Sequence, residues 1–467
     1  MTAHTDAVVP IADFTANLTF DRLPDSVVMA VKRILLDTLG TTLAANTLGV
    51  GCKELVRVVQ RAGGSPDATL IGIGGKIPAA NAALANGGLS HALNFDDVAG
   101  PRGSGHMGVT SIPAALAAAE YRRGVSGRDF LTAIAAGNEL MARLGLAISL
   151  SEQGYSESKP QPTQMPGCFS ATVSAGRALG LSSHQVHSAL GHALMQASGG
   201  RQPVLEGRPA KAIYAAYSNQ VGMLSALLVE AGLDCDCEVF EGEAGLFKTY
   251  YHGRYQRDAL ADGLGNDWRM LDVGFKLWPT TNVAAPFIDA ARQLRDELDL
   301  NPDEVSDIHI IGGAHARTFC EPESRRKNPQ SPVEGEDSIF FATAKALATG
   351  NVTLADLQPN DAGLRQREAL LLTSRMHLTV EDELNRSGIV EVTLMDGRSA
   401  SRRVDTPVGH PSNPMPAEML QTKFFACAQH ASLDLSRESL ERVVDLVEHV
   451  DDVEDIAMIP RLLGGES

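Results

Sequence analysis

The sequence predicts a mainly α-helical fold in which a large all-helical domain is interrupted by a smaller α+β domain. Residues 24 to about 265 read as one helical pattern after another. Strand-like segments appear only beyond about residue 270, and the helical pattern returns after Pro407. We therefore expect an all-helical domain of residues 1–270 plus 407–467 and an α+β domain of residues 271–406.

The predicted helices share apolar residues at helical spacing and many small side chains. Asp25 is the expected N-cap of the first long helix, and Ser182 and Ser183 are expected to cap a later one. Several helices are predicted to stop at a glycine, namely Gly124, Gly180 and Gly232. Because many of the helices are rich in Ala and Gly, neighbouring helices are expected to pack closely. Their segments are SIPAALAAAEYRRG, RDFLTAIAAGNELMARLGLAISL, CFSATVSAGRALGL, SSHQVHSALGHALMQASGG and AIYAAYSNQVGMLSALLVEAGL.

The smaller domain is identified by its strand signals. VSDIHIIGGAHA and SRMHLTVEDEL are expected strands, and GIVEVTLMDGRSASRRVD is an expected hairpin that turns at Asp396-Gly397. The segment between the first two, EDSIFFATAKALATGNVTLADL, is expected to be helical. Active sites are often found in the cleft between two domains of this kind.

The amino-acid composition limits the kinds of molecule that this protein is expected to bind. The 467 residues carry 57 acidic and 40 basic side chains, a net charge of −17, which disfavours nucleic acid and anionic membranes as partners. A small anionic substrate stays compatible, because salt screens surface charge beyond about 10 Å. The N-terminus lacks the pattern of a signal peptide and no uninterrupted apolar run reaches membrane-spanning length, so we expect a cytoplasmic protein. The six cysteines are scattered and are expected to be free thiols.

Three motifs suggest a metal or nucleotide site, but each lacks a feature that such a site requires. Cys235 and Cys237 form a CxC without the further ligands of a zinc site. GIGGK at residues 72–76 lacks the strand, turn and helix of a nucleotide-binding loop. His187 and His192 are five residues apart and so do not share a helix face for metal binding. No other ligand cluster is evident, and we expect no metal.

The polar segment LNFDDVAGPRGSGHMG, residues 93–108, is the first of five motifs that resemble one family. ANGGLSHALNFDD precedes the loop with His106; GRPAKAIYAAYSNQVGMLSALL, FEGEAGLFKTYY, FKLWPTTNVAAPFIDAA and VGHPSNPMPAEMLQTKF follow in order. In this order they resemble the MmgE/PrpD family, whose members include dehydratases, decarboxylases and epimerases of small carboxylates. The resemblance implies a helical domain with an α+β lid, a homodimer and no cofactor.

The resemblance also assigns site residues. It places His106, Lys211 and Lys276 as the catalytic set. The expected substrate-binding residues are Arg102, for its guanidinium group in the loop of His106, and the family positions Asn94, Asp96, Asp97, Gln161, Tyr214 and Phe341. Several positions depart from the titratable residues of decarboxylase-like members: Asn94 replaces an aspartate, Val98 a threonine, Gln161 a histidine, Tyr214 a histidine, Thr281 and Ala285 two histidines, and Phe341 a tyrosine.

The implied chemistry is proton transfer at a carbon next to a carboxylate. Such a reaction passes through an enediolate-like species, which fixed cations stabilise. Lys211 and Lys276 suit that role, Arg102 could bind a carboxylate, and Gly103 and Gly105 would let the backbone approach a ligand. His106 suits general acid or base work near neutral pH.

Each assignment has a simpler alternative. His106 could be a solvated loop residue, Lys211 could extend to the surface, and Lys276 could be a linker charge. For Asp96 and Asp97 a structural role in the loop is favoured over direct chemistry. The leading function is a cofactor-independent lyase on a small di- or tricarboxylate; the alternatives are an epimerase of an amino- or imino-dicarboxylate and a non-catalytic carboxylate-binding protein.

Overall fold

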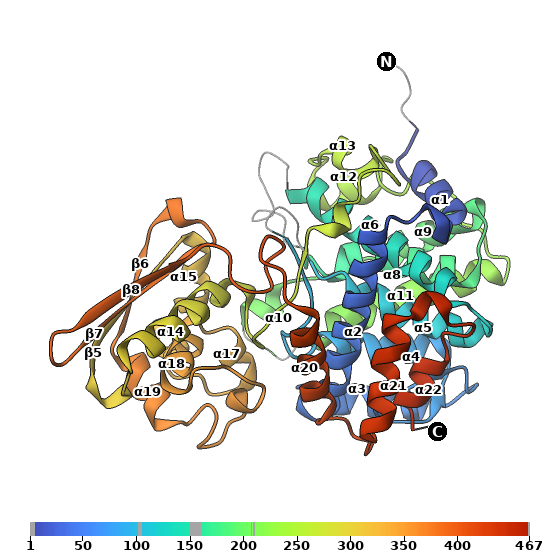
Figure 1. Ribbon diagram of the computed structural model, residues 1–467. Coiled ribbons are helices and arrows are strands. Elements are labelled where there is room, and N and C mark those ends of the chain that lie inside the picture. The colour runs from blue at the N-terminus through green and yellow to red at the C-terminus, as the bar shows by residue number, and fades with distance from the viewer. Residues whose placement is uncertain (1–4, 101–104, 150–159, 207, 209–210, 466–467) are drawn as a thin grey trace. The chain divides into compact units, whose positions relative to one another are not determined.

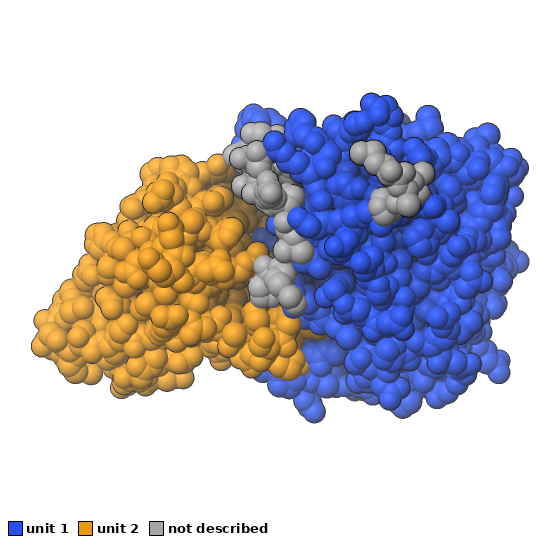
Figure 2. All heavy atoms as spheres, turned by 90° about the horizontal axis from the view of Figure 1, so that it is seen from above, with its two compact units in different colours: residues 1–274, 416–467 blue, residues 275–415 orange. Residues whose placement is uncertain are grey.

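A computed structural model describes residues 5–100, 105–149, 160–206, 208 and 211–465 (Figure 1). The chain divides into two compact units (Figure 2). Unit 1 comprises residues 1–274 and 416–467, and unit 2 comprises residues 275–415. The smaller unit thus interrupts the larger one in sequence, and its action as a lid stays a prediction.

Unit 1 is built mainly from helices. In Figure 1, α2, α4, α5, α8 and α11 lie together, and α11 packs against both α4 and α8 while α8 packs against α5 and α6. The helices are α1 (Val8–Asn17), α2 (Asp25–Leu48), α3 (Cys52–Ala62), α4 (Ala79–His91), α5 (Gly108–Arg122), α6 (Gly127–Ser149), α8 (Gln164–Leu179), α9 (Ser183–Gln196), α10 (Gln202–Leu205), α11 (Lys211–Glu230), α12 (Leu246–Tyr251), α13 (Arg257–Ala261), α20 (Ala417–Ala428), α21 (Arg437–Glu448) and α22 (Met458–Leu463).

Small residues let the central helices approach closely, as their composition predicts. A Cβ atom on Gly87 of α4 would lie 2.8 Å from the carbonyl oxygen of Ala215 in α11. A Cβ atom on Gly222 of α11 would lie 2.4 Å from the carbonyl carbon of Ala171 in α8. Both positions therefore need a residue without a side chain, because backbone atoms of the facing helix occupy that space.

The helix ends follow the predicted signals in part. Ser182 caps α9 in a capping box with Gln185, and Gly180 ends α8 with a φ of 76°. The prediction for Asp25 is wrong: Pro24 is the N-cap of α2, and Asp25 is the first helical residue. Proline is extended there and leaves Asp25 in the first turn, where a carboxylate suits the helix dipole.

Unit 1 is not all-helical, which corrects the predicted class of this domain. Two antiparallel two-stranded sheets occur in it: β1 (Ala68–Thr69) with β2 (Lys76–Ile77), and β3 (Val98–Ala99) with β4 (Val273–Gly274). Strands of two residues are too short to produce an alternating pattern in the sequence. The GIGGK glycines lie in the turn between β1 and β2, where Gly72, Gly74 and Gly75 have positive φ angles.

Unit 2 contains a four-stranded sheet in the order β6-β5-β7-β8. Strand β5 (Val305–Gly312) runs parallel to β6 (Met376–Val380) and antiparallel to β7 (Gly388–Leu394), which pairs with β8 (Ser399–Val404). The predicted hairpin is confirmed, with Gly397 in the turn at a φ of 88°. The helices of unit 2 are α14 (Ala285–Leu298), α15 (Ala314–Cys320), α16 (Glu323–Arg326), α17 (Pro332–Glu336), α18 (Ile339–Thr349) and α19 (Arg367–Ser374).

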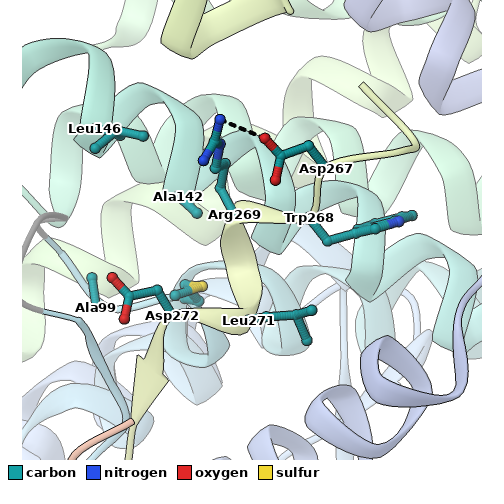
Figure 3. A pocket seen from close by; sticks show the side chains of 9 residues that line it. Ala99, Ala142, Leu146, Asp267, Trp268, Arg269, Leu271 and Asp272 are labelled. Atoms are coloured by element: carbon teal, nitrogen blue, oxygen red, sulfur yellow. Dashed lines mark ion pairs between the residues drawn. The ribbon is translucent and has the colours of Figure 1, made fainter. Parts of the chain in front are cut away.

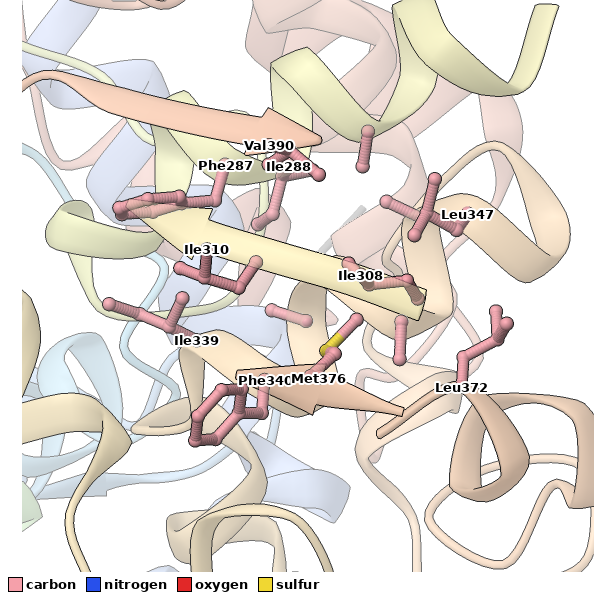
Figure 4. Close-up of a cluster of buried hydrophobic side chains, with 14 of the residues drawn as sticks. Phe287, Ile288, Ile308, Ile310, Ile339, Phe340, Leu347, Leu372, Met376 and Val390 are labelled. Carbon is pink, nitrogen blue, oxygen red and sulfur yellow. The ribbon is translucent and has the colours of Figure 1, made fainter. Parts of the chain in front are cut away.

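A single hydrophobic cluster holds unit 2 together (Figure 4). Ile308 and Ile310 of β5 lie in it with Phe287 of α14 and Phe340 of α18, and all four are at most 1% exposed. Short 3₁₀ turns connect several elements of both units: η1 (Phe20–Arg22), η2 (Arg269–Leu271), η3 (Asn282–Ala284), η4 (Pro302–Glu304), η5 (Ala355–Leu357), η6 (Asp382–Leu384) and η7 (Val450–Asp452).

Two helices, Gly127–Ser149 and Lys211–Glu230, are long and apolar enough to cross a membrane by length and composition. Their apolar windows are 94% and 67% buried inside the molecule. Helices in the core of a folded domain have the same character.

Candidate active site

The candidate site is built on the connection between α4 and α5. Helix α4 ends at His91, and Asn94 then takes the left-handed conformation with a φ of 49°. Asparagine tolerates this conformation better than most residues do. The chain next forms β3, and α5 begins at Gly108 directly after His106 and Met107. The position of Asn94 in this turn gives it a backbone role that its sequence assignment as a ligand did not include.

Asp97 anchors the start of α5. Its two carboxylate oxygens accept hydrogen bonds from the backbone N–H groups of Met107, at 2.9 Å, and Gly108, at 3.0 Å. A Cβ atom on Gly108 would lie 2.7 Å from Oδ1 of Asp97, so glycine lets the carboxyl group approach. The structural role expected for Asp97 is confirmed by these bonds.

Asp96 lies between two histidines. Its Oδ2 atom is 3.0 Å from Nδ1 of His91 and 2.7 Å from Nδ1 of His106. Asp96 is fully buried, whereas the side chain of His106 is 17% exposed. These contacts of Asp96 are with imidazoles, and they orient the histidine that the sequence predicts to be catalytic.

The hydrogen bonds of His106 decide its tautomer. Its Nδ1 atom lies 2.6 Å from the backbone carbonyl oxygen of Asp97 as well as close to the Asp96 carboxylate. Both neighbours are acceptors, so we infer that Nδ1 carries a proton and donates it to them. The second ring nitrogen, Nε2, is then left to exchange a proton with a substrate.

His91 is a member of this group that sequence reasoning missed. Burial lowers its pKa to about 3, the positive charges of His106 and Lys211 add to the decrease, and Asp96 opposes it. His91 is therefore neutral at physiological pH, and its Nδ1 donates to Asp96. Its position at the end of a helix, five residues before Asp96, matches neither helical nor strand spacing, so no periodic signal marks it.

The carboxyl group of Asp97 has a strongly shifted pKa. Burial raises it to about 8, with further increases from the charges of Asp96 and Asp37, against the backbone hydrogen bonds that lower it. Asp97 is therefore mostly protonated at neutral pH. The carboxyl group that contacts the two imidazoles is that of its neighbour, Asp96.

Lys423 of α20 connects the C-terminal helices to this loop. Its Nζ atom lies 2.6 Å from Oδ1 of Asp37 in α2 and donates to the carbonyl oxygen of Phe95 at 2.5 Å. The same ammonium group lies 3.9 Å from the centre of the Phe95 ring. Lys423 and Asp37 are 6% and 2% exposed, so the ion pair is buried directly behind the loop.

Two predicted residues on α11 belong to the same unit. Lys211 is the first residue of α11, and its charge reaches the site, because it contributes to the lowered pKa of His91. Tyr214 follows one turn later and is 4% exposed. Its hydroxyl group has no hydrogen-bond partner among the described residues, and burial raises its pKa.

Gln161 and Arg102 have different outcomes. The side-chain oxygen of Gln161 accepts hydrogen bonds from the backbone N–H groups of Thr163, at 2.6 Å, and Gln164, at 2.7 Å, at the start of α8. Its oxygen is thus used inside the fold, and substrate binding by its amide nitrogen stays a prediction. Arg102 and Gly103 lie outside the described residues.

The remaining predicted residues belong to unit 2. Lys276 is 5% exposed at the start of that unit. Phe341 is fully buried in its hydrophobic cluster, and its backbone N–H donates to Ser338 at the start of α18. Packing therefore accounts for Phe341. That Lys276 and Phe341 join the residues of unit 1 in one site stays a prediction.

A cavity adjoins the loop within unit 1 (Figure 3). It measures about 300 Å³ and is lined by Ala99 and Met107 from the loop, together with residues of α6 and the segment 267–272. Arg269 and Asp267 form an ion pair of 2.5 Å at its wall, and Asp272 stands beside Ala99. Among the described residues that line the cavity, the one cation, Arg269, already pairs with a carboxylate, which disfavours binding of a carboxylate substrate there.

The side chains of His91, Asp96 and His106, beside the loop, could also bind a metal ion. The ligand atoms of His91, Asp96 and His106 lie within 4.8 Å of one another, a cluster that the sequence did not reveal. The distances of 2.7 and 3.0 Å from Asp96 to the imidazoles have the length of hydrogen bonds, which explain the arrangement without an ion. The absence of a cofactor therefore stays a prediction, for which a direct test is available.

Comparison with known proteins agrees with the two-part chain. Residues 9–258 match the MmgE/PrpD N-terminal domain, and residues 278–449 match the MmgE/PrpD C-terminal domain. The chain is 26% identical to cis-aconitate decarboxylase of Mus musculus over 96% of its own length and 92% of that protein. It is 27% identical to the Homo sapiens protein of that name, with 96% and 93% covered, and 25% identical to that of Aspergillus terreus, with 99% and 96% covered. The chain belongs to the MmgE/PrpD family.

Proposed function

We propose that this protein is a lyase that removes CO₂ or water from a small di- or tricarboxylate, without a cofactor. The observation that carries the proposal is the fixed orientation of His106. Asp96 and the carbonyl group of Asp97 engage its Nδ1 atom, so Nε2 is presented for proton transfer. The names of the relatives described above make decarboxylation the first reaction to test.

In this mechanism His106 moves the proton at the carbon next to a carboxylate. Its neutral form accepts the proton in an elimination, and its protonated form supplies one to the carbon that loses CO₂. Asp96 stabilises the imidazolium form of His106 in both reactions, because its buried carboxylate lies 2.7 Å from Nδ1 of that ring. The imidazole thus keeps its orientation while it accepts or donates the proton.

The negative charge that develops on the substrate needs a cation. Lys211 fits this role from within unit 1, because its field already reaches His91. Lys276 is the second cation in the proposal and would act from unit 2. Two ammonium groups would hold two carboxylates and leave the reacting carbon to His106.

The departures from decarboxylase-like residues lead us to expect a different preferred substrate. Asn94 cannot ionise, so it binds by hydrogen bonds and is not a base. Tyr214 presents a buried hydroxyl group where those members have a histidine. We therefore expect slow turnover of cis-aconitate and faster turnover of another small polycarboxylate.

The test is NMR of the protein in D₂O with a panel of small polycarboxylates that includes cis-aconitate, 2-hydroxy tricarboxylates and iminodicarboxylates. Release of CO₂ supports a decarboxylase, and a new alkene with all carbons retained supports a dehydratase. The His106→Ala variant is expected to lose turnover and to keep substrate binding. The matched control is His449→Ala, because His449 is an exposed histidine at the end of α21. Binding without any exchange across the panel would contradict the lyase.

An epimerase is the second candidate, and the same experiment separates it from the lyase. Deuterium entering the substrate without net product would indicate epimerisation. That reaction needs a second acid–base group, and His91 is poorly placed for it, because it is buried and its Nδ1 shares the Asp96 oxygen with His106.

The proposal also includes a cytoplasmic homodimer with no nucleic-acid or membrane partner.

A further inference from the structure

Another cavity of unit 1 brings together basic side chains from three separate elements. It measures about 230 Å³, and Lys76 of β2, Arg123 after the end of α5 and Arg461 of α22 line it. The other lining residues are Pro66, Asp67, Glu120 and Ala457. Three of the seven are thus basic, in a chain whose net charge is −17. None of the predicted site residues lines this cavity, so it is separate from the surroundings of His106.

The two acidic side chains of the cavity wall are already used inside the fold. Glu120 accepts hydrogen bonds from the backbone N–H of Thr69, at 2.8 Å, and from its hydroxyl group, at 2.7 Å. One oxygen of Glu120 also lies 3.1 Å from Nζ of Lys76. Asp67 accepts a hydrogen bond of 3.2 Å from the backbone N–H of Ala79 at the start of α4. These carboxylates therefore hold β1, β2 and α4, and they leave few acceptors for the basic side chains.

The donors of the cavity are correspondingly in excess. Lys76 has three N–H groups and Arg461 has five, and each of the two forms one ion pair, with Glu120 and with Asp455 respectively. Arg123 is exposed, and its guanidinium group forms no ion pair or hydrogen bond with any residue that the structure describes. Unused donors from three elements around one small cavity are the complement of an anion with several oxygen atoms.

The backbone of Arg123 gives an independent indication of a ligand. Five of the described non-glycine residues have a positive φ, and four of them are Asn, Asp or His, which tolerate it best. The fifth is Arg123, with a φ of 65° and a ψ of 146°. A side chain makes this conformation costly, and residues held in such conformations cluster at ligand-binding sites. Glycine would fit the backbone better, but it would remove the guanidinium group from the cavity.

We propose that this cavity is a binding site for a phosphate group, held by Lys76, Arg123 and Arg461. Phosphate has acceptor oxygens in all directions, so it can engage donors that come from three elements, and a guanidinium group can bind two of its oxygens at once. A carboxylate has two oxygens in one plane and engages fewer of these donors. The cavity is smaller than those that hold drug-sized ligands, which suits a phosphate ion or the phosphate end of a larger molecule.

Calorimetric titration of the full-length protein with inorganic phosphate, in a phosphate-free buffer at constant ionic strength, tests the site. We expect one saturable site with a Kd of about 1 mM or lower. Arg123→Gly and Arg461→Met are each expected to weaken binding at least tenfold. Arg57→Ala is the matched control, because Arg57 is an exposed arginine of α3 that does not line the cavity. Its affinity for phosphate should equal that of the wild type.

Thermal unfolding separates the ligand role of Arg123 from a structural one. Because glycine suits the backbone at this position, we expect Arg123→Gly without phosphate to have a Tm no lower than that of the wild type. Phosphate should raise the Tm of the wild type and of Arg57→Ala, and should leave that of Arg123→Gly unchanged. A lower Tm of Arg123→Gly in phosphate-free buffer would show that contacts inside the fold hold Arg123, and would overturn the argument from its backbone.

Malonate distinguishes this cavity from a carboxylate site. Malonate binding anywhere else in the protein, including beside His106, is expected to be the same in the wild type and in Arg123→Gly. The proposal is overturned if the wild type shows no saturable phosphate binding, if Arg123→Gly binds phosphate as tightly as the wild type, or if the substitution weakens malonate binding as much as phosphate binding. Because none of these measurements uses turnover, they hold whether or not the proposed lyase activity is found.

Discussion

The imidazole rings of His91 and His106 lie side by side, with centroids 4.7 Å apart and planes tilted by 59°. They differ in exposure, because the side chain of His91 is 2% exposed and that of His106 is 17% exposed. Through the single Asp96 oxygen between them, the buried ring helps to set the position of the accessible one. This division of roles leads to the first two predictions.

His91 is expected to act as a positioning residue. In His91→Phe, Asp96 loses one of its two imidazole donors and orients His106 less firmly, so we expect kcat to fall by about 10- to 100-fold while KM changes little. His91→Gln, which can still donate to Asp96, should recover part of the rate. Steady-state kinetics with the pH profile of kcat checks this, and an unchanged profile in His91→Phe would remove His91 from the site.

Asp96→Asn should be more damaging than the loss of His91. The amide can donate to Nδ1 of His106 and thereby place the ring proton on Nε2, the wrong nitrogen for a base. We expect kcat to fall by roughly 10³- to 10⁴-fold, a size seen when a catalytic histidine is held in the wrong tautomer. Calorimetry of substrate binding should show nearly unchanged affinity, and an equal loss of affinity would point to a binding role instead.

Asp97 is expected to make stability depend on pH. Its folded pKa of about 8 lies above the ordinary value of 3.8, so the folded state holds a proton that the unfolded state has lost. Stability from this group therefore falls as pH rises between these values and levels off above about 8. His91, whose pKa is lowered to about 3, acts in the opposite direction, but only below its ordinary value of 6.5.

The clean window for this effect is therefore pH 6.5 to 8, bounded by those two groups. Asp97→Asn imitates the protonated carboxyl group, so we expect its free energy of unfolding to change less with pH in this window than that of the wild type. Urea unfolding at several pH values measures the slope. Parallel curves for the two proteins would show that Asp97 is ionised in the fold.

The Lys423–Asp37 pair should be costly to break from one side. Lys423→Met leaves a buried carboxylate without its ammonium partner, and we expect the free energy of unfolding to fall by about 3 to 5 kcal/mol. Removing both charges in Lys423→Met with Asp37→Leu should restore part of that loss. Chemical denaturation of the three proteins gives the coupling, and additive losses would show that the two charges are independent.

Removal of metal ions is expected to leave turnover unchanged. Dialysis against a strong chelator followed by an assay of the best substrate from the panel tests this directly. Loss of activity that a divalent ion restores would instead identify His91, Asp96 and His106 as metal ligands. Elemental analysis of the purified protein is the accompanying control.

Much of the fold follows from patterns that repeat over many residues. The long helices from α2 to α11 and the hairpin at Gly397 have such patterns, and the structure contains them. The short sheets β1–β2 and β3–β4 do not, because two residues carry no period. Tertiary contacts create them, since β3 and β4 come from segments more than 170 residues apart along the chain.

For the candidate site, the sequence suggests a role where a residue type itself suggests chemistry, as for His106 and Lys211, and these roles stay predictions. The site was not predictable where burial gives a residue its role. His91 and Lys423 look ordinary in sequence, and only the fold places one beside Asp96 and the other beneath Phe95. Conversely, Gln161 and Asn94 suggest ligands, but a helix start and a left-handed turn also account for them.

The bond from Lys423 to the carbonyl group of Phe95 joins residues 328 positions apart. On a ribosome that adds about 5 to 20 residues per second, roughly 15 to 65 s separate the synthesis of these two residues. A nascent chain that already contains His106 therefore lacks the brace of its loop until α20 has emerged. Unfinished or prematurely terminated chains are accordingly expected to be inactive, which ties activity to completion of translation.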